Sequence, residues 1–272
     1  MTGAYGDTFC LTLFTNNPEL AFSAERAGVD RIGPDLEHLG KHARQGRGNT
    51  WISDHTLADI FTLAAKIDKR HLFCRINPIH PDSATEIEAL LEAGVATVML
   101  PMFTTVREVE TFLRLLDGRA HPVLLLETAS AAAIVGDICR VPGVKEIHIG
   151  LNDLRLSLGW PSHFHVLVSE FLVGLSDTIN EAGIAFRLGG LGRADDDTLP
   201  IPSSLVYPQF PRLHATGALL SRVFFNAEPH DMVAEVRKLR GCLDFYAGEP
   251  GESLECQRHA LQRRIGVQET GP

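Results

Sequence analysis

The stretch LEAGVATVML, residues 91–100, ends an amphipathic helical pattern with Ala-Gly and continues directly into a short apolar run. A glycine just past the last helical residue supplies the left-handed conformation that closes a helix. The same order recurs in AERAGVDRI (24–32), in NEAGIAFRL (180–188) and, with Pro-Gly, in VPGVKEIHIG (141–150). Short apolar runs that follow helices in this way are typical of the buried strands of a parallel sheet.

Extended over the whole chain, this rhythm predicts an α/β fold with eight strands. The strands are expected near 8–14, 29–35, 71–77, 96–101, 122–127, 144–150, 184–189 and 216–223. Helical patterns lie at about 18–27, 56–67, 83–93, 105–116, 129–140, 163–181 and 229–240, with a loop and one short helix in 190–215. Eight such units in 272 residues fit a TIM barrel, typically about 250 residues long. An open doubly wound sheet is the competitor, but no GxGxxG follows the first strand. We predict a single-domain (β/α)8 barrel over 1–246, with a polar tail at 247–272 that packs on a neighbouring subunit or frays.

Composition excludes several classes of partner. The net charge is −9, whereas nucleic acids and anionic membranes attract proteins with a surplus of Lys and Arg. No apolar run approaches the roughly 20 residues of a membrane span, and the N-terminus lacks the pattern of a signal peptide. The five cysteines are scattered without CxxC pairs, which suits free thiols in a reducing compartment. We therefore expect a cytoplasmic protein with a small-molecule substrate, and neither nucleic acid nor membrane as its partner.

Polar residues collect where the predicted strands end, and in a barrel that end carries the chemistry. The positions are Asp35 to His38, Arg75 to Asn77, Glu127, Gly150, Asn152, Asp153, Ser221 and Arg222. Glu127 and Asp153 follow consecutive strands, so their carboxylates are neighbours that repel each other unless a cation or a proton intervenes. Mg²⁺ takes one or two carboxylates with waters and substrate oxygens. The alternative is that each carboxylate only caps the helix or turn behind it.

Several segments resemble one enzyme family. LLLETASAAAIVGDICRVPGVKEIHIGLNDLRLSLG (124–159) resembles the Glu-Thr and Gly-x-x-Asp-Leu-x-x-x-x-Gly segments of the HpcH/HpaI aldolase and citrate lyase β-subunit family, the class II metal-dependent 2-oxo-acid aldolases. DLEH (35–38) and CRIN (74–77) resemble that family's second and third strand signatures, and AGVATVMLPMFTTVREVE (93–110) its fourth strand region. The resemblance spans about residues 20 to 225.

The resemblance implies a (β/α)8 barrel that uses a divalent metal, Mg²⁺ or Mn²⁺, held by Glu127 and Asp153. It implies that Arg75 contacts the 2-oxo acid and steadies the enolate oxygen. His38 is implied as the general base, with Asp35 as its partner. The substrate carboxylate is expected on the backbone amides of the loop formed by Gly150, Leu151, Asn152 and Asp153. Members of the family are often homo-oligomers, hexameric or built from dimers, that exchange their last helix.

The expected activity is that of an aldolase, a carbon–carbon lyase acting through a pyruvate- or oxaloacetate-type enolate. Two alternatives stay open. One is a citrate-synthase-like or acyl-CoA-linked condensing enzyme with the same metal–enolate site, and the other is a barrel that binds without catalysis. The loop at 39–55 bears on the choice because its basic residues either grip an acceptor or are merely solvated. These residues are Lys41, His42, Arg44 and Arg47.

Two further features lie close to the predicted site. His148 falls inside the sixth strand and is interpreted as structural or as a support for the site. Gly189, Gly190 and Gly192 leave room at the barrel mouth, although a glycine-rich turn alone is weak evidence of phosphate binding.

Overall fold

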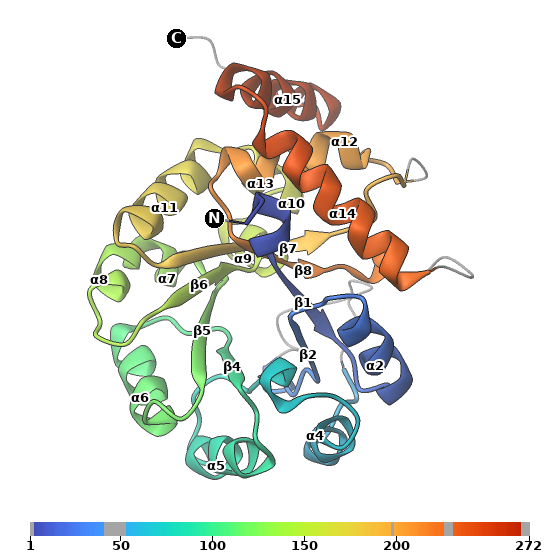
Figure 1. Cartoon of the computed structure of the whole chain (residues 1–272). Helices are drawn as coiled ribbons and strands as arrows, with labels where there is room; N and C mark the ends of the chain where they lie inside the picture. Colours follow the sequence, from blue (N-terminus) through green and yellow to red (C-terminus); the bar gives the residue numbers. More distant parts are fainter. Residues whose placement is uncertain (1–2, 41–52, 197–198, 226–230, 268–272) are drawn as a thin grey trace.

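The computed structural model describes residues 3–40, 53–196, 199–225 and 231–267. Within these ranges eight parallel strands form a barrel, as the sequence predicts. They are β1 Cys10–Phe14, β2 Arg31–Gly33, β3 Phe73–Arg75, β4 Thr97–Leu100, β5 His121–Leu126, β6 Glu146–Ile149, β7 Ala185–Leu191 and β8 Gly217–Leu220. The hydrogen-bonded order is β2-β1-β8-β7-β6-β5-β4-β3, and single bridges from Ile32 to Leu72 and from Asp35 to Arg75 close the ring between β2 and β3. Figure 1 shows the strands at the centre with the helices around them.

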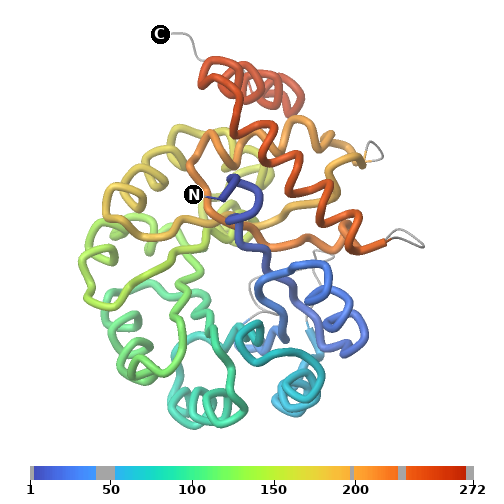
Figure 2. Tube along the Cα trace, in the orientation of Figure 1, coloured from blue at the N-terminus to red at the C-terminus, as the bar shows by residue number. Residues whose placement is uncertain are grey.

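The helices surround the strands, and the trace returns to β1 through β8 (Figure 2). They are α1 Tyr5–Thr8, α2 Pro18–Arg26, α4 Leu57–Ala64, α5 Ser83–Ala93, α6 Val106–Leu116, α7 Ala129–Ala133, α8 Val135–Cys139, α9 Leu151–Leu158, α10 His163–Leu167, α11 Glu170–Glu181, α12 Ser203–Val206, α13 Gln209–Arg212, α14 Met232–Ala247 and α15 Gly251–Arg264. In the part of the chain that the structure describes, 3₁₀ turns cover Lys69–His71 and Arg222–Phe224. No helix in the described ranges combines the length and apolar character needed to cross a bilayer.

The helices differ from the sequence expectation in several places: the short helix α1 was not expected, and the pattern at 163–181 divides into α10 and α11. The pattern at 129–140 divides into α7 and α8 at Ile134, whose backbone leaves the helical region. A helix not predicted, α9, begins directly after Gly150. The loop expected at 190–215 holds two short helices, α12 and α13. Of these differences, α9 matters for function because its N-terminus lies at the end of β6.

The apolar side chains form two separate clusters, one outside the strands and one inside. The outer cluster fills the space beneath the helices and includes Ile147 and Ile149 of β6. The inner cluster consists of Phe73, Met99, Val123 and Leu125, with Phe14 packed against it. Because successive residues of a strand point to opposite faces, Glu146 and His148 of β6 point into the barrel.

Buried charges close the N-terminal end of the barrel interior. Glu146 is only 1% exposed and accepts two hydrogen bonds from Arg31, at 2.6 and 2.8 Å. The ring of His121 lies 3.0 Å from the same carboxylate, and Arg187 Nε lies 2.7 Å from its Oε1. Gly217 leaves the space for Arg187, since a Cβ there would lie 2.3 Å from Arg187 Nη1. We call Glu146, Arg31, His121 and Arg187 the Glu146 cluster.

The C-terminal segment that the sequence presents as a polar tail forms helix α15. It packs against α12 and α13 of the same chain, outside the ring of helices (Figure 1). Leu254 and Leu261 are its buried residues, and Arg258 donates to Glu170 Oε1 at 2.8 Å. A contact between this segment and a neighbouring subunit stays a prediction.

Candidate active site

Arg75 is held rigidly where β3 ends, across the seam that closes the barrel. Its Nε and Nη2 donate to the two carboxylate oxygens of Asp35, at 2.8 and 2.7 Å. Glu37 Oε2 lies 3.2 Å from the same Nη2, and the Phe14 ring centroid lies 5.0 Å from the guanidinium carbon. Asp35 and Glu37 lie two residues apart in the segment that follows β2, so their side chains point to the same side of it. The planar fork of the guanidinium therefore has one orientation at the barrel mouth.

The charge of Arg75 is secured by the same neighbours. Burial works to lower the pKa of the guanidinium, but the carboxylates of Asp35 and Glu37 outweigh burial and raise that pKa above its ordinary value. The side chain keeps 13% of its surface exposed. A permanent cation with a small accessible surface is suited to bind an anionic oxygen in a site with little water.

Glu127 follows β5 and is buried, with 3% of its surface exposed. Its Oε1 accepts a hydrogen bond from the Met102 amide at 3.1 Å. Met102 has φ 54°, in the left-handed region that residues other than glycine rarely occupy. Backbone strain of this kind concentrates at functional sites, and here it directs an amide toward the carboxylate.

Gly150 makes the room that the Glu127 side chain occupies. A Cβ at this position would lie 2.7 Å from Glu127 Oε2 and 2.9 Å from Glu127 Cβ. We expect Gly150→Ala to displace the carboxylate and to destabilise the fold by about 1–3 kcal/mol, the usual cost of overpacking. Chemical denaturation measures the change. Gly174→Ala on α11 is the control, since a Cβ there meets nothing within 4 Å; equal stability of the two variants would contradict the close packing.

The Glu127 carboxyl has a strongly perturbed affinity for its proton. Burial raises its pKa well above the ordinary value, and the positive charge of Arg75 works in the opposite direction. The negative charges of Glu37 and Asp153 add to the rise, while the hydrogen bond from Met102 opposes it. Among the described residues whose charges act on this carboxyl, two carboxylates, Glu37 and Asp153, stand against one guanidinium, that of Arg75. An added cation would relieve their repulsion.

The N-terminus of α9 presents backbone donors beside Glu127. Gly150 caps the helix, and the first helical hydrogen bond runs from the Leu154 amide to the Gly150 carbonyl, at 3.0 Å. The amides of residues 151–153 therefore have no acceptor within the helix. The side-chain oxygen of Asn152 accepts from Arg155 Nε at 3.3 Å. The helix dipole and these amides together favour an anion such as a carboxylate.

His38 lies at the mouth with its ring exposed. Its Nε2 donates to the carbonyl of His55 at 3.1 Å, and its amide donates to Asn77 Oδ1 at 2.9 Å. The described residues do not bring this ring into a hydrogen bond with Asp35, whose carboxylate binds Arg75. His55 is tied to the same segment because its Nδ1 accepts from the Asp35 amide at 2.9 Å. Burial lowers the pKa of His55, with Asp35 opposing the change.

The number and type of carboxylates at the barrel mouth decide whether they could bind a metal ion. The described ranges contain no group of three or more His, Cys, Asp or Glu side chains placed to hold a metal. Glu127 and Asp153 nevertheless influence each other's charge, and two carboxylates suffice for Mg²⁺, which keeps waters and substrate oxygens as its other ligands. The donor set therefore fits a hard divalent cation. Most of the basic 39–55 loop, at 41–52, lies outside the described residues.

Glu37, Met102 and His55 belong to this site without having been assigned a role from the sequence. Glu37 could have been found from strand alternation, because it lies two residues after Asp35 on the same face. Met102 and His55 carry no comparable signal. Their contacts depend on how the loops after β4 and β2 fold over the barrel mouth.

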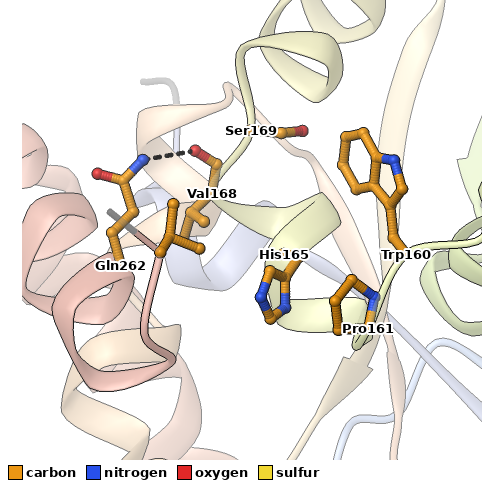
Figure 3. A pocket seen from close by; sticks show the side chains of 7 residues that line it. Trp160, Pro161, His165, Val168, Ser169 and Gln262 are labelled. Atoms are coloured by element: carbon orange, nitrogen blue, oxygen red, sulfur yellow. Dashed lines mark hydrogen bonds between the residues drawn. The ribbon is translucent and has the colours of Figure 1, made fainter. Parts of the chain in front are cut away.

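A separate hollow lies away from the strand ends. It has a volume of about 330 Å³ and lies between the segment that follows α9 and helix α15. Its lining includes Trp160, Pro161, His165, Val168, Ser169 and Gln262. Figure 3 shows Gln262 on one side of it, donating to the Val168 carbonyl at 3.3 Å, with Trp160 on the other. None of the predicted site residues line this hollow.

The chain is similar to several known proteins. A family model described as HpcH/HpaI aldolase/citrate lyase matches residues 9–169. Among solved structures, an HpcH/HpaI aldolase from Desulfitobacterium hafniense DCB-2 is similar with 17% identity and a TM-score of 0.61, over 79% of this chain and 86% of the other. The citrate lyase beta subunit from M. tuberculosis, solved with oxaloacetate and magnesium, is similar with 19% identity and a TM-score of 0.60, over 88% and 98%.

The citrate synthase SbnG is also similar, with 17% identity and a TM-score of 0.58, over 79% of this chain and 86% of the other. At these identities the solved structures establish the shared fold. No curated protein sequence matches the chain.

Proposed function

The chain belongs to the HpcH/HpaI aldolase/citrate lyase family, and on that basis we propose that it is a divalent-metal-dependent carbon–carbon lyase of the aldehyde-lyase type. It would cleave or form the bond next to a 2-oxo acid through a pyruvate- or oxaloacetate-type enolate. One observation carries the proposal. A rigid Arg75, a buried Glu127 with Asp153 nearby, and the N-terminus of α9 meet where the strands end.

Arg75 supplies the fixed positive charge that the reaction needs. When the carbon–carbon bond breaks, an electron pair moves onto the 2-oxo acid and negative charge grows on its C2 oxygen. Asp35 and Glu37 hold the guanidinium in place before that charge appears, so little reorganisation accompanies the step. Asp35 thus acts in this proposal by orienting Arg75.

Glu127 and Asp153 are the residues that would hold Mg²⁺ or Mn²⁺. Such an ion, when bound, supplies a Lewis acid that polarises the carbonyl of the substrate. The neighbour from M. tuberculosis, solved with magnesium and oxaloacetate, supports this choice of ion and substrate class. The amides of residues 151–153, at the N-terminus of α9, would bind the substrate carboxylate, which orients C2 toward Arg75.

His38 is the proposed general base. Its exposed position at the mouth allows it to exchange protons with solvent, and its hydrogen bond to the His55 carbonyl fixes the Nε2 proton, leaving Nδ1 as an acceptor. Nδ1 would take the proton from the hydroxyl next to the bond that breaks.

A condensing enzyme that resembles citrate synthase is the second candidate. It would use the same Arg75, Glu127 and Asp153 to bind a 2-oxo acid such as oxaloacetate, and the enolate of a thioester would attack its C2 carbonyl. Hydrolysis of the thioester by water would then release the free thiol. The similarity to citrate synthase SbnG favours keeping this candidate. Incubation of oxaloacetate with acetyl-CoA separates the two candidates, because only the condensing enzyme would release free thiol.

The experiment that tests the proposal is proton exchange at the methyl group of pyruvate in D₂O, followed by NMR. Exchange is expected with Mg²⁺ or Mn²⁺ and not after chelation, because the enolate forms without any second substrate. Absence of exchange with pyruvate, and equally with the methylene of oxaloacetate, would contradict an enolate mechanism at this site.

Arg75→Lys is expected to lower the rate of this exchange by about 10²–10³-fold, the usual effect of losing one group that stabilises an oxyanion. A lysine keeps the charge but cannot donate in parallel to both oxygens of Asp35. The control is Arg119→Lys, since Arg119 makes the same two-bond contact with Glu88 on the surface, at 2.9 and 2.8 Å. Unchanged turnover in Arg75→Lys would remove Arg75 from the mechanism.

A further inference from the structure

His148 lies in the barrel interior beneath the proposed site. On β6 it pairs in register with Leu125 of β5 and Arg187 of β7. Two residues further along these three strands come Gly150, Glu127 and Gly189, so His148 is one interior layer below the mouth. Below it in turn lies Glu146. The imidazole thus stands between the Glu146 cluster and the residues proposed to bind substrate.

This imidazole is almost entirely buried and makes no hydrogen bond to the residues that the structure describes. Its residue is 2% exposed, and no donor or acceptor among the described residues contacts its ring nitrogens. Buried polar groups in native proteins are nearly always hydrogen-bonded, because leaving one unpaired is unfavourable. Around it, Phe73, Met99, Val123 and Leu125 form the apolar inner cluster. A leucine or phenylalanine would fill this place at less cost, so the histidine calls for another reason.

The ring is directed toward the mouth of the barrel. Its Nε2 would lie 3.6 Å from a Cβ built on Gly189, which is one layer closer to the mouth. The space beside Gly150, which follows β6, is filled by the Glu127 side chain, so the opening above the ring is the one that Gly189 leaves. The sequence interpretation of His148 as structural does not explain this direction.

Charge state decides what such a ring could contact. Burial lowers the pKa of His148 to about 4, with Arg31 and Arg75 acting in the same direction and Glu146 against it. At neutral pH the ring is therefore uncharged, with one nitrogen donating and the other accepting. A neutral imidazole suits an oxygen that carries partial or resonance-shared charge, such as those of a carbonyl, an enolate or a carboxylate.

We propose that His148 is a substrate-binding residue that hydrogen-bonds an oxygen of the 2-oxo-acid unit from inside the barrel. The inference rests on the proposed function and adds to it a polar contact from beneath the strand ends. Arg75 and the α9 amides bind the substrate at the strand ends, and His148 would bind it from the layer below. The substrate would then supply the hydrogen-bond partner that the described residues do not provide.

Binding of oxalate, a planar dianion with the shape and charge of a pyruvate enolate, tests this directly by isothermal titration calorimetry with saturating Mg²⁺. His148→Leu is expected to weaken oxalate at least about tenfold, the effect of losing one hydrogen bond to a charged group. Gly189→Ala should weaken oxalate binding as well. Its methyl carbon would lie 3.6 Å from His148 Nε2 and 3.5 Å from the Ile149 carbonyl oxygen, which are ordinary contact distances, and it would cover the ring nitrogen. The control for the glycine substitution is Gly174→Ala on α11, where the added Cβ meets nothing within 4 Å.

Titration of Mg²⁺ without oxalate tests metal binding alone. The affinity for Mg²⁺ should be unchanged in His148→Leu, because His148 is proposed to bind the substrate and not the metal. His148→Gln, which can still hydrogen-bond, should recover part of the oxalate affinity, whereas a purely structural role predicts no such recovery. Unchanged oxalate affinity in His148→Leu would overturn the inference and leave the proposed function standing. If that variant fails to fold, Gly189→Ala decides in the same way. Absence of oxalate binding by the wild-type protein with Mg²⁺ would overturn both.

Discussion

Glu127→Gln should abolish metal-dependent proton exchange while leaving the barrel folded. Glutamine has the size of glutamate but is a poor ligand for a hard cation, so the activity should fall by more than about 100-fold, the upper end of what loss of a supporting residue alone costs. Exchange at the pyruvate methyl group measures the loss. Glu88→Gln on the surface is the matched control, and full exchange in Glu127→Gln would refute the metal assignment.

The same substitution is expected to stabilise the metal-free protein. The pKa of Glu127 in the folded protein is raised above the unfolded value of about 4.3, so ionisation of this carboxyl favours unfolding. The unfavourable contribution is absent below pH 4 and grows as the pH rises through the folded pKa. Glutamine does not ionise, so the stability advantage of the variant should increase between pH 5 and pH 8. Urea denaturation with a chelator present measures it, and a variant less stable than wild type at pH 8 would contradict the strained burial of this charge.

Asp153→Asn should lose the exchange in the same way but affect Glu127 differently. The negative charge of Asp153 contributes to the raised pKa of Glu127, and its removal relieves part of that rise. Because both residues would hold the same ion, the double variant Glu127→Gln/Asp153→Asn should lose no more exchange activity than either single variant.

The barrel and its polar end were predictable because the relevant signals are local. Helix-closing glycines such as Gly94, with φ 87°, and short apolar runs placed each strand within a few residues. Period-two alternation in VLLLET places Glu127 on the same face as Val123 and Leu125, which lie in the inner cluster. The end of a parallel strand is also the mouth of the barrel, so position along the chain translated directly into position in the site.

The pairing of side chains at the site was not predictable, because it depends on contacts between distant segments. Asp35 binds Arg75 across the β2–β3 seam, 40 residues apart in sequence, and nothing local favours that choice over His38. His55 enters through the loop beyond β2, whose path the sequence pattern does not define. The start of α9 was missed because the helix is only two turns long and begins at a glycine cap without a side-chain signal.

Charges inside the barrel were missed for a different reason. The run KEIHIG, 145–150, is predicted as a buried strand, but the sequence alone names no partner for Glu146, which lies on the interior face of the closed barrel. Glu146 therefore carries a buried negative charge. The structure resolves the apparent conflict by bringing Arg31 and Arg187 from β2 and β7 to the same carboxylate.

Glu146→Gln is accordingly expected to cause the largest loss of stability. The variant leaves two buried guanidinium groups without a counter-charge, a change that costs about 3–5 kcal/mol when one partner of a buried ion pair is removed. Burial already lowers the pKa of Arg187 to about 10 because little water reaches its guanidinium, so water cannot replace the lost carboxylate. A fall in Tm of at least about 6 °C should follow for a chain of this size. Glu88→Gln, which breaks an exposed pair with Arg119, should change Tm little.

The pH dependence gives an independent check on the same carboxylate. Burial alone would raise the pKa of Glu146, but hydrogen bonds from His121 and Arg31 outweigh it and lower that pKa below the ordinary value. The stability that the cluster contributes is thus complete above the unfolded pKa of about 4.3 and is lost as the pH falls through the folded pKa. On acidification the wild-type protein should lose stability relative to Glu146→Gln, so the difference between their free energies of unfolding should become smaller below pH 4. A difference that stays constant from pH 7 to pH 3 would mean that packing rather than charge stabilises this end of the barrel.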